Sequence, residues 1–161
     1  MIFIIDKKQK VYIKELNMES LNSWISPDLK ALSFTELKNP TEILNFINNC
    51  TNYCEINYNT EKIEDIISNN NYLAYIYYKN DNPLGFLISD ISVKDNKKIL
   101  KIENVGILNK YIEKSHELDF IKSIIFKAWE KKGIDKIIIT FKSTENKMKE
   151  IMKDLEFRKE Y

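Results

Sequence analysis

Glu103 is a carboxylate in a predicted strand, a residue type that can do acid–base chemistry. It lies within Ile99–Ile107, a segment whose composition favours a strand. A carboxylate in such a strand can act as a general base when burial raises its pKa. Alternation predicts two faces, one with Lys101, Glu103 and Val105 and the other with Ile102, Asn104 and Gly106. Both faces mix polar and apolar side chains, which leaves open whether Glu103 faces a site or solvent.

The turn after this strand is a second place where chemistry could occur. A helix N-terminus binds anions such as pyrophosphate, and glycines let the backbone approach them. Here the turn reads Ile112-Glu113-Lys114-Ser115-His116-Glu117 and contains no glycine. We predict Ser115 as the N-cap and Glu117 as a first-turn carboxylate, so an incoming pyrophosphate would meet like charge. Lys110 and Lys114 could compensate in part.

The remaining nucleophilic and metal-ligating side chains are few. Cys50 and Cys54 are the only cysteines, and we interpret them as reduced, semi-buried thiols of a cytosolic protein. His116 is the only histidine. It is either a base or, in the alternative interpretation, an exposed residue of a first helical turn. A structural zinc site of Cys and His alone needs more such ligands than the chain has, and no metal is expected.

Composition excludes several classes of function. The chain has 161 residues, the size of one domain, and we expect a single domain over 1–161. Lys+Arg 25 against Asp+Glu 24 gives no electrostatic reason to bind nucleic acid or an anionic membrane. The only arginine, Arg158, argues against bidentate phosphate recognition. No apolar run approaches the ~18–20 residues that span a bilayer. Ile2–Ile5 is too short for a signal peptide, so we expect a cytoplasmic protein.

The apolar periodicity predicts the elements that must position these residues. Strands are expected at Ile2–Ile5 and Val11–Glu15 (a hairpin), Tyr72–Lys79, Leu84–Val93, Ile99–Ile107, Lys136–Phe141 and Phe157–Tyr161. Helices are expected at Met18–Ser26, Thr41–Asn49, Thr60–Ser68, Glu117–Lys132 and Asn146–Asp154, the last capped by Ser143 or Thr144.

The connections between these elements predict the fold class. A crossover helix at Glu117–Lys132 makes the strands on either side of it parallel in an otherwise antiparallel sheet. The class is therefore α+β, a mixed, mostly antiparallel central sheet flanked by helices, in the order β-α-α-β-β-β-α-β-α-β.

That order, with Lys132-Gly133-Ile134 before a strand and Asn146 ahead of Leu155-Glu156-Phe157, resembles the GNAT (GCN5-related N-acetyltransferase) superfamily. The resemblance covers most of the chain and rests on topology and spacing more than on signature residues. It implies a sheet whose fourth and fifth strands splay apart. The pantetheine arm of an acyl thioester lies between them, and the pyrophosphate lies at the start of the next helix.

The resemblance also implies roles for particular residues. Glu103 would deprotonate the acceptor amine, directly or through water. The backbone of Val105, Gly106 and Ile107 would hold the pantetheine arm and polarise the thioester carbonyl. Gly106 within a strand marks either a bulge or a close backbone approach. The remaining cofactor-binding residues that the resemblance implies are Lys110, Lys114, Ser115 and Asn146, of which Asn146 is alternatively only a helix-start residue.

The chain departs from the family's pattern at several positions. The basic position and both glycine positions of the family's turn fall on Ile112, Ser115 and Glu117. The tyrosine that often protonates the leaving thiolate falls on Met152, which has no proton to donate, and the glycine before the final Phe falls on Glu156. Tyr111 is an alternative donor.

A closer resemblance is to the C-terminal GNAT-like domain of polyketide glyceryl-transferase/phosphatase proteins. That domain also lacks the glycines, and its Asn-rich stretch is similar to Asn48–Tyr53 here, with Lys110, Lys114 and Glu117 at matching places. The family's cysteine falls on Asn109, and its dehalogenase-type half is absent. The resemblance therefore suggests common ancestry more than retained chemistry. We interpret Asn48–Asn59 as a polar loop that shapes an acceptor pocket.

Two functions from different classes follow. In the first, the chain transfers an acyl group from acetyl-CoA or another acyl thioester, on CoA or on a carrier protein, to an amine or hydroxyl. In the second, it is a catalytically silent GNAT-like module that binds a protein partner or a small ligand. The acceptor stays open. So does a homodimer in which a neighbouring chain supplies a final strand.

Overall fold

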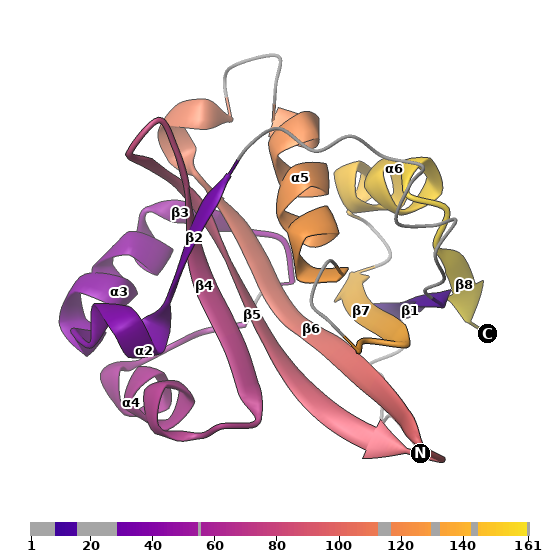
Figure 1. Ribbon diagram of the computed structural model, residues 1–161. Helices are drawn as coiled ribbons and strands as arrows, with labels where there is room; N and C mark the ends of the chain where they lie inside the picture. The colour runs from indigo at the N-terminus through magenta and orange to yellow at the C-terminus, as the bar shows by residue number, and fades with distance from the viewer. Residues whose placement is uncertain are drawn as a thin grey trace.

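The computed structural model of the chain describes residues 9–15, 29–54, 56–112, 117–129, 133–142 and 145–160. A mixed sheet carries helices on both of its faces (Figure 1). In chain order the elements are β1 Gln9–Glu15, β2 Lys30–Ser33, α2 Phe34–Leu37, α3 Pro40–Asn48, β3 Cys50–Asn52, α4 Thr60–Ser68, β4 Tyr72–Lys79, β5 Asn82–Lys94, β6 Lys97–Leu108, the short 3₁₀ helix η1 Asn109–Tyr111, α5 Glu117–Trp129, β7 Lys136–Lys142, α6 Asn146–Asp154 and β8 Arg158–Glu160.

The strands lie in the order β2-β4-β5-β6-β7-β1-β8, and β3 pairs with β6 beside this path. All of these pairs are antiparallel except β6 with β7, which is parallel from Ile99 opposite Lys136 to Ile102 opposite Ile139. The expected class, α+β with a mixed and mostly antiparallel sheet, is therefore confirmed. So is the parallel pair across the crossover helix.

Two tight turns shape the meander of β4, β5 and β6. Asn80 and Asp81 have φ of 51° and 66°, and Asp95 and Asn96 have φ of 53° and 62°. Two successive positive φ values match the right-handed twist of a hairpin, and Asn and Asp tolerate them best among non-glycine residues. Strand β5 begins at Asn82, two residues before the predicted start at Leu84.

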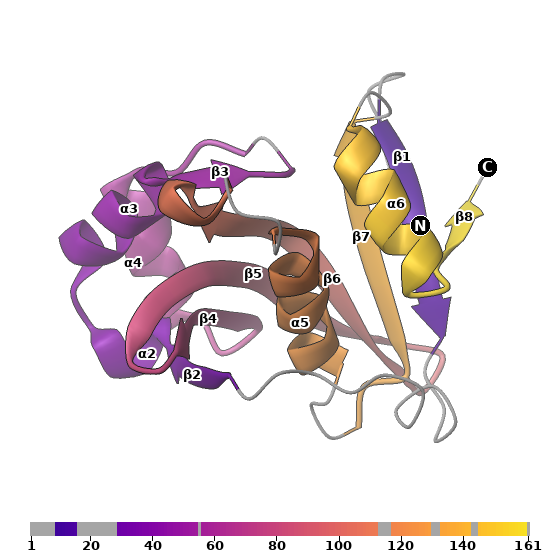
Figure 2. The same ribbon diagram turned by 90° about the horizontal axis from the view of Figure 1, so that it is seen from above.

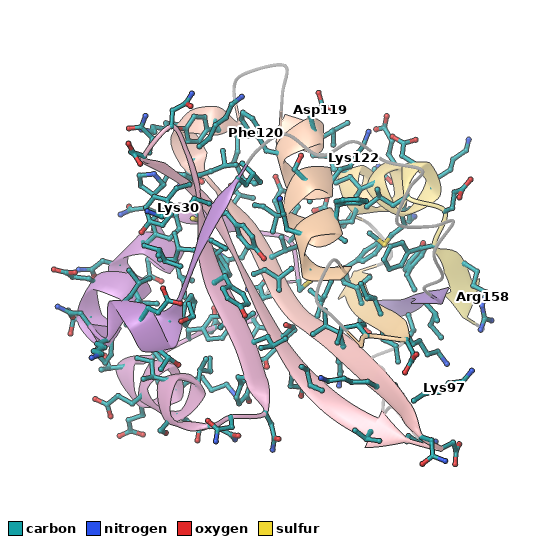
Figure 3. All side chains as sticks on the ribbon, viewed as in Figure 1. Lys30, Lys97, Asp119, Phe120, Lys122 and Arg158 are labelled. Atoms are coloured by element: carbon teal, nitrogen blue, oxygen red, sulfur yellow. The ribbon has the colours of Figure 1, made fainter. Side chains whose placement is uncertain are left out.

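The sheet separates two apolar cores. One lies under α2, α3 and α4, and its fully buried members include Phe34, Ile43, Ile63, Phe86 and Ile88. The other lies under α5 and α6, and its fully buried members include Leu87, Val105, Ile124, Phe141 and Ile151. Lys122 of α5, labelled in Figure 3, forms an ion pair with Asp154 of α6 at 2.7 Å, which joins the two helices over this core.

The N-terminal strand β1 lies among the C-terminal elements. It pairs with β7 on one side and with β8 on the other. The hairpin partner expected at Ile2–Ile5 and the helix expected at Met18–Ser26 lie outside the described residues. Strand β1 therefore completes the part of the sheet that the C-terminal strands β7 and β8 form.

Several local predictions need correction. Strands β2 and β3 and helix α2 were not expected. The N-cap of α6 is Glu145, whose carboxylate accepts from the Lys147 N–H at 3.3 Å, and not Ser143 or Thr144. No helix in the described part of the chain is both long and apolar enough to cross a membrane.

Candidate active site

A β-bulge in β6 lies at Glu103. The register between β5 and β6 shifts here and leaves Glu103 without an opposite residue. A bulge adds one residue to one strand, so the alternation of faces reverses beyond it. Val105 and Ile107 therefore belong to the same core as Ile102. The expected common face for Lys101, Glu103 and Val105 is wrong for this reason.

Strands β6 and β7 part at the same place. Their parallel pairing ends at Ile102 opposite Ile139, whereas β6 continues to Leu108. Figure 2 shows the two strands diverging, with β3 lying along β6 on the side away from β5. The splay that the sequence resemblance implied is thus present in the sheet, and Glu103 is the first residue of β6 beyond the last parallel pair.

Burial governs the acidity of Glu103. Its side chain is 19% exposed. Loss of water raises the pKa of this carboxyl above its ordinary value of 4.5, Lys62 opposes the shift, and the nearby Asp90 carboxylate adds to it. The Tyr58 hydroxyl donates to Glu103 Oε1 at 3.4 Å, which also favours the charged form. The net effect is a carboxyl group that holds a proton more tightly than an exposed glutamate does.

Lys62 of α4 lies at the edge of this group. Its Nζ is 3.9 Å from Glu103 Oε1 and donates to the Tyr72 hydroxyl at 2.7 Å. It also lies 5.0 Å from the centre of the Tyr72 ring. The hydrogen bond with Tyr72 raises the pKa of Lys62, so this ammonium stays charged and partly balances Glu103.

A polar pocket of about 390 Å³ adjoins the same group. Its walls are Ile47, Asn48, Asn52, Ile56, Asn57 and Tyr58. Tyr58 therefore both lines the pocket and contacts Glu103. Burial raises the pKa of Tyr58, so its hydroxyl stays protonated and available as a donor. Residues of the Asn-rich segment thus form the wall of this pocket. That the pocket binds an acceptor stays a prediction.

Asn104 joins β6 to the segment that follows β3. The side chain is fully buried, and its Oδ1 accepts from the N–H of Val105 at 2.9 Å and of Cys54 at 3.2 Å. Its Nδ2 donates to Asn52 Oδ1 at 2.9 Å. The structure shows that all of these bonds go to the protein itself.

Strand β3 occupies the edge of β6 that faces the splay. Asn52 lies opposite Gly106 and Thr51 opposite Ile107, and the Tyr53 N–H donates to the Val105 carbonyl at 3.0 Å. The other edge of β6 pairs with β5. A Cβ on Gly106 would lie 2.9 Å from the Thr51 carbonyl oxygen and 2.3 Å from Phe86 Cε1, so the close approach at this glycine is made by the chain itself.

A buried cluster joins this segment to α5 and α6. The Tyr53 hydroxyl donates to Glu117 Oε1, and Lys147 Nζ donates to both Glu117 oxygens at 3.0 and 2.9 Å. Tyr53 is 3% and Glu117 7% exposed. Burial and then the Glu117 carboxylate raise the pKa of Tyr53, so it remains a hydrogen-bond donor. Glu117 is the first residue of α5, where the helix dipole favours an anion.

The predicted cofactor-binding residues are only partly brought together. The backbone of Val105, Gly106 and Ile107 lines the splay but is paired with β3. Lys110 is exposed on η1, with its Nζ 5.2 Å from the Tyr111 ring centre. Asn146 is exposed at the start of α6. Lys114 and Ser115, together with His116, lie outside the described residues.

Sequence reasoning missed four residues of this region: Tyr53, Tyr58, Lys62 and Lys147. Tyr53 and Tyr58 lie in the Asn-rich segment, but no residue pattern indicates the contacts that any of the four makes. Sequence spacing does not show that Lys147 bonds Glu117 thirty positions away. The two cysteines are buried thiols, and burial raises the pKa of each to about 12. Among the described residues, no group of three or more His, Cys, Asp or Glu side chains could hold a metal ion.

No model of a known protein family matches the sequence, and no curated protein matches it. Solved structures do. The aminoglycoside acetyltransferase meta-AAC0020 from an uncultured soil metagenomic sample, solved with sisomicin, is 11% identical, with 80% of this chain and 86% of that chain covered and a TM-score of 0.58. AAC(6′)-Iy, solved with a bisubstrate analogue that contains CoA, is 9% identical, with 82% and 92% covered and a TM-score of 0.59.

A GNAT-family protein from Novosphingobium aromaticivorans is 12% identical, with 94% of this chain and 59% of that chain covered and a TM-score of 0.60. The chain has the GNAT fold. The GNAT resemblance expected from the sequence is confirmed at the level of fold, and the closer resemblance to the polyketide glyceryl-transferase domain stays a prediction. At identities this low, the matches establish the arrangement of the backbone.

A residue with a left-handed backbone ends α6. Glu156, at the family's glycine position, has φ of 61°. The Phe157 N–H bonds the Met152 carbonyl at 2.8 Å and the Glu156 N–H bonds the Lys153 carbonyl at 3.0 Å, which is the Schellman pattern of a helix end. Glu156 thus adopts the left-handed backbone conformation that glycine favours.

Proposed function

We propose that this chain is an acyltransferase that moves an acyl group from a pantetheine thioester to an amine or hydroxyl acceptor. The observation that carries the proposal is Glu103, a largely buried carboxylate with a raised pKa at the bulge where β6 leaves β7. Such a group suits general-base catalysis, because its pKa lies closer to the working pH than that of an exposed glutamate. The GNAT fold of the aminoglycoside acetyltransferases supports the reaction class.

The pocket beside Tyr58 would hold the acceptor. A protonated amine there would give its proton to Glu103, directly or through Tyr58. In the second route the Tyr58 hydroxyl passes its own proton to Glu103 and takes one from the amine. The free amine would attack the thioester carbonyl carbon, forming the C–N bond and breaking the C–S bond. The second proton that the nitrogen then loses, and the one held by Glu103, would pass to solvent. The thiolate would take a proton from solvent, since Met152, at the family's tyrosine position, has none to give.

The donor substrate would be acetyl-CoA or another acyl thioester, carried on CoA or on a carrier protein. The backbone of Val105, Gly106 and Ile107 is the proposed partner of the pantetheine arm, and Lys110 and Asn146 are proposed farther along it. Lys114 and Ser115 keep their predicted roles in the turn. The backbone groups can take this role only where β3 is not paired with them. A cytoplasmic location and a homodimer stay predictions.

The proposal is tested by replacing Glu103 with Gln. A panel of amines and alcohols is incubated with acetyl-CoA, and acetylated products are detected by mass spectrometry. Glu103→Gln should lower turnover by about 10²–10⁴-fold, the usual contribution of a general base, and should leave the dissociation constant for acetyl-CoA unchanged. Glu64→Gln on the exposed side of α4 is the matched control. Full turnover in Glu103→Gln would reject Glu103 as the base.

A second candidate function rests on a different observation. The donor side of the splay is filled by β3, and the start of α5 carries the buried Glu117 carboxylate. A catalytically silent module that binds a ligand in the 390 Å³ pocket would need neither group to move. This candidate predicts that Glu103→Gln leaves every binding function intact and that no variant binds an acyl thioester.

A further inference from the structure

Strand β3 lies on the β6 edge to which the proposed donor would bind. We propose that β3 occupies the edge of β6 at which the acyl donor binds. The extended pantetheine arm of the acyl thioester then binds by displacing β3 from this edge. The inference rests on the proposed acyltransferase function and concerns the control of its donor site. It assigns Tyr53, Glu117 and Lys147 as residues that set donor affinity without touching the reacting atoms.

The hydrogen bonds of β3 are of the kind that a pantetheine arm can replace. Thr51 and Asn52 lie opposite Ile107 and Gly106 in an antiparallel ladder, and the Tyr53 N–H donates to the Val105 carbonyl. A pantetheine arm is extended and carries amide N–H and C=O groups, so it can add to a strand edge as a peptide does. Both occupants need the same backbone groups of β6. They therefore exclude each other.

The pairing of β3 is short compared with that of its neighbours. It comprises three residues, whereas β5 and β6 pair along strands of 13 and 12 residues. Thr51 and Asn52 are also only partly buried. Release of β3 therefore leaves the meander intact, because the other edge of β6 keeps all of its bonds to β5. Local opening of such a unit needs less free energy than global unfolding.

The cluster around Glu117 fixes β3 in place. Tyr53 follows β3 directly, and its hydroxyl donates to the Glu117 carboxylate, which Lys147 also binds from α6. A carboxylate at the start of α5 occupies the position that the helix dipole offers to an anion. Lys147 has a half-exposed side chain and can bind an incoming phosphate once Glu117 is released. The same cluster thus holds β3 and fills the anion position.

The exchange predicts how variants change donor affinity. When only the open fraction can bind, the apparent dissociation constant is the intrinsic constant divided by that fraction. Tyr53→Phe removes a hydrogen bond to a buried carboxylate and should tighten donor binding about tenfold. Glu117→Gln should tighten binding of acetyl-CoA more than that of acetyl-pantetheine, because only acetyl-CoA brings a diphosphate that the carboxylate repels. Tyr78→Phe, on β4 and away from β3, is the matched control.

The experiment combines affinity with hydrogen exchange on the full chain. Dissociation constants of acetyl-CoA and acetyl-pantetheine are measured by calorimetry for the wild type, Tyr53→Phe, Glu117→Gln and Tyr78→Phe. Amide exchange of the segment 50–54 is followed by mass spectrometry with and without each compound. Because the donor displaces β3, saturation should speed exchange of this segment, whereas a ligand usually slows exchange where it binds.

Each outcome separates the two proposals. Faster exchange at 50–54 on donor binding, together with tighter binding by Tyr53→Phe, supports the exchange. Donor binding that leaves this segment unchanged or slows it, with equal affinities for Tyr53→Phe and Tyr78→Phe, overturns the exchange and leaves the acyltransferase proposal standing. If neither compound binds the wild type, Tyr53→Phe or Glu117→Gln, both proposals fail and the silent module is favoured.

Discussion

Replacing Asn104 with Ala should release β3 from β6 and destabilise the protein. The substitution removes the acceptor of the Cys54 and Val105 N–H groups and the donor to Asn52 Oδ1. A buried polar group left without a partner costs about 1–3 kcal/mol. The two N–H groups lie in buried surroundings, whereas Asn52 is partly exposed and can bond water. We therefore expect a loss of about 3 kcal/mol in the free energy of unfolding.

The assay is reversible urea unfolding, followed by circular dichroism, with thermal unfolding as a second measure. For a domain of this size, 1 kcal/mol corresponds to about 2–4 °C, so the melting temperature should fall by about 6–12 °C. Asn45→Ala on the exposed side of α3 is the control and should change stability by less than about 0.5 kcal/mol. A loss below about 1 kcal/mol for Asn104→Ala would refute the reasoning that Asn104 fastens β3.

The remaining predictions concern acid–base behaviour and the backbone. Because burial raises the pKa of Glu103, turnover should rise as the pH passes through a value above 4.5, which a pH–rate profile can measure. The stability that the protonated carboxyl contributes should be lost as the pH rises over the same range, which unfolding at different pH values can measure. Tyr58→Phe removes a bond that favours the charged form and should move the acid limb of that profile to higher pH. Glu156→Gly should stabilise the helix end by about 0.5–1 kcal/mol in thermal unfolding, since φ is 61° there. Gly106→Ala should destabilise by about 1–3 kcal/mol in urea, because its Cβ would meet Phe86 and Thr51, and a neutral result would contradict that contact.

Elements that depend on short stretches of sequence were predicted correctly. Helix α4 begins and ends at Thr60 and Ser68, and α6 at Asn146 and Asp154, as the apolar spacing indicated. The parallel pair of β6 and β7 followed from the crossover helix between them. These predictions were correct because helix periodicity and crossover handedness depend on short stretches of chain.

Features that depend on distant pairing could not be predicted in the same way. Strand β1 lies between β7 and β8, a place that no local pattern specifies. Strand β3 is three residues long, too short for alternation to be recognised. The bulge at Glu103 reversed the faces of β6, because one extra residue changes the side of every residue beyond it.

In the candidate site, too, one residue could be predicted from the sequence and its partners could not. The family resemblance pointed to Glu103, whose residue type suits a general base, although the strand pattern alone did not show which way it faces. Its partners Tyr58 and Lys62 come from the segment before β4, and only folding brings them to β6. The link from Tyr53 through Glu117 to Lys147 joins β3, α5 and α6 and has no trace in the sequence order.

The measurement that tests the acyltransferase proposal most directly is a thermal-shift titration with acetyl-CoA, compared with desulfo-CoA and acetyl-pantetheine. A ligand at 100 times its dissociation constant stabilises the folded state by about 2.7 kcal/mol, or about 5–10 °C for a domain of this size. We predict a saturable rise in melting temperature for the wild type, and a rise at lower ligand concentration for Tyr53→Phe. No shift with any of the three compounds, in either protein, would contradict the proposal that this fold holds an acyl thioester.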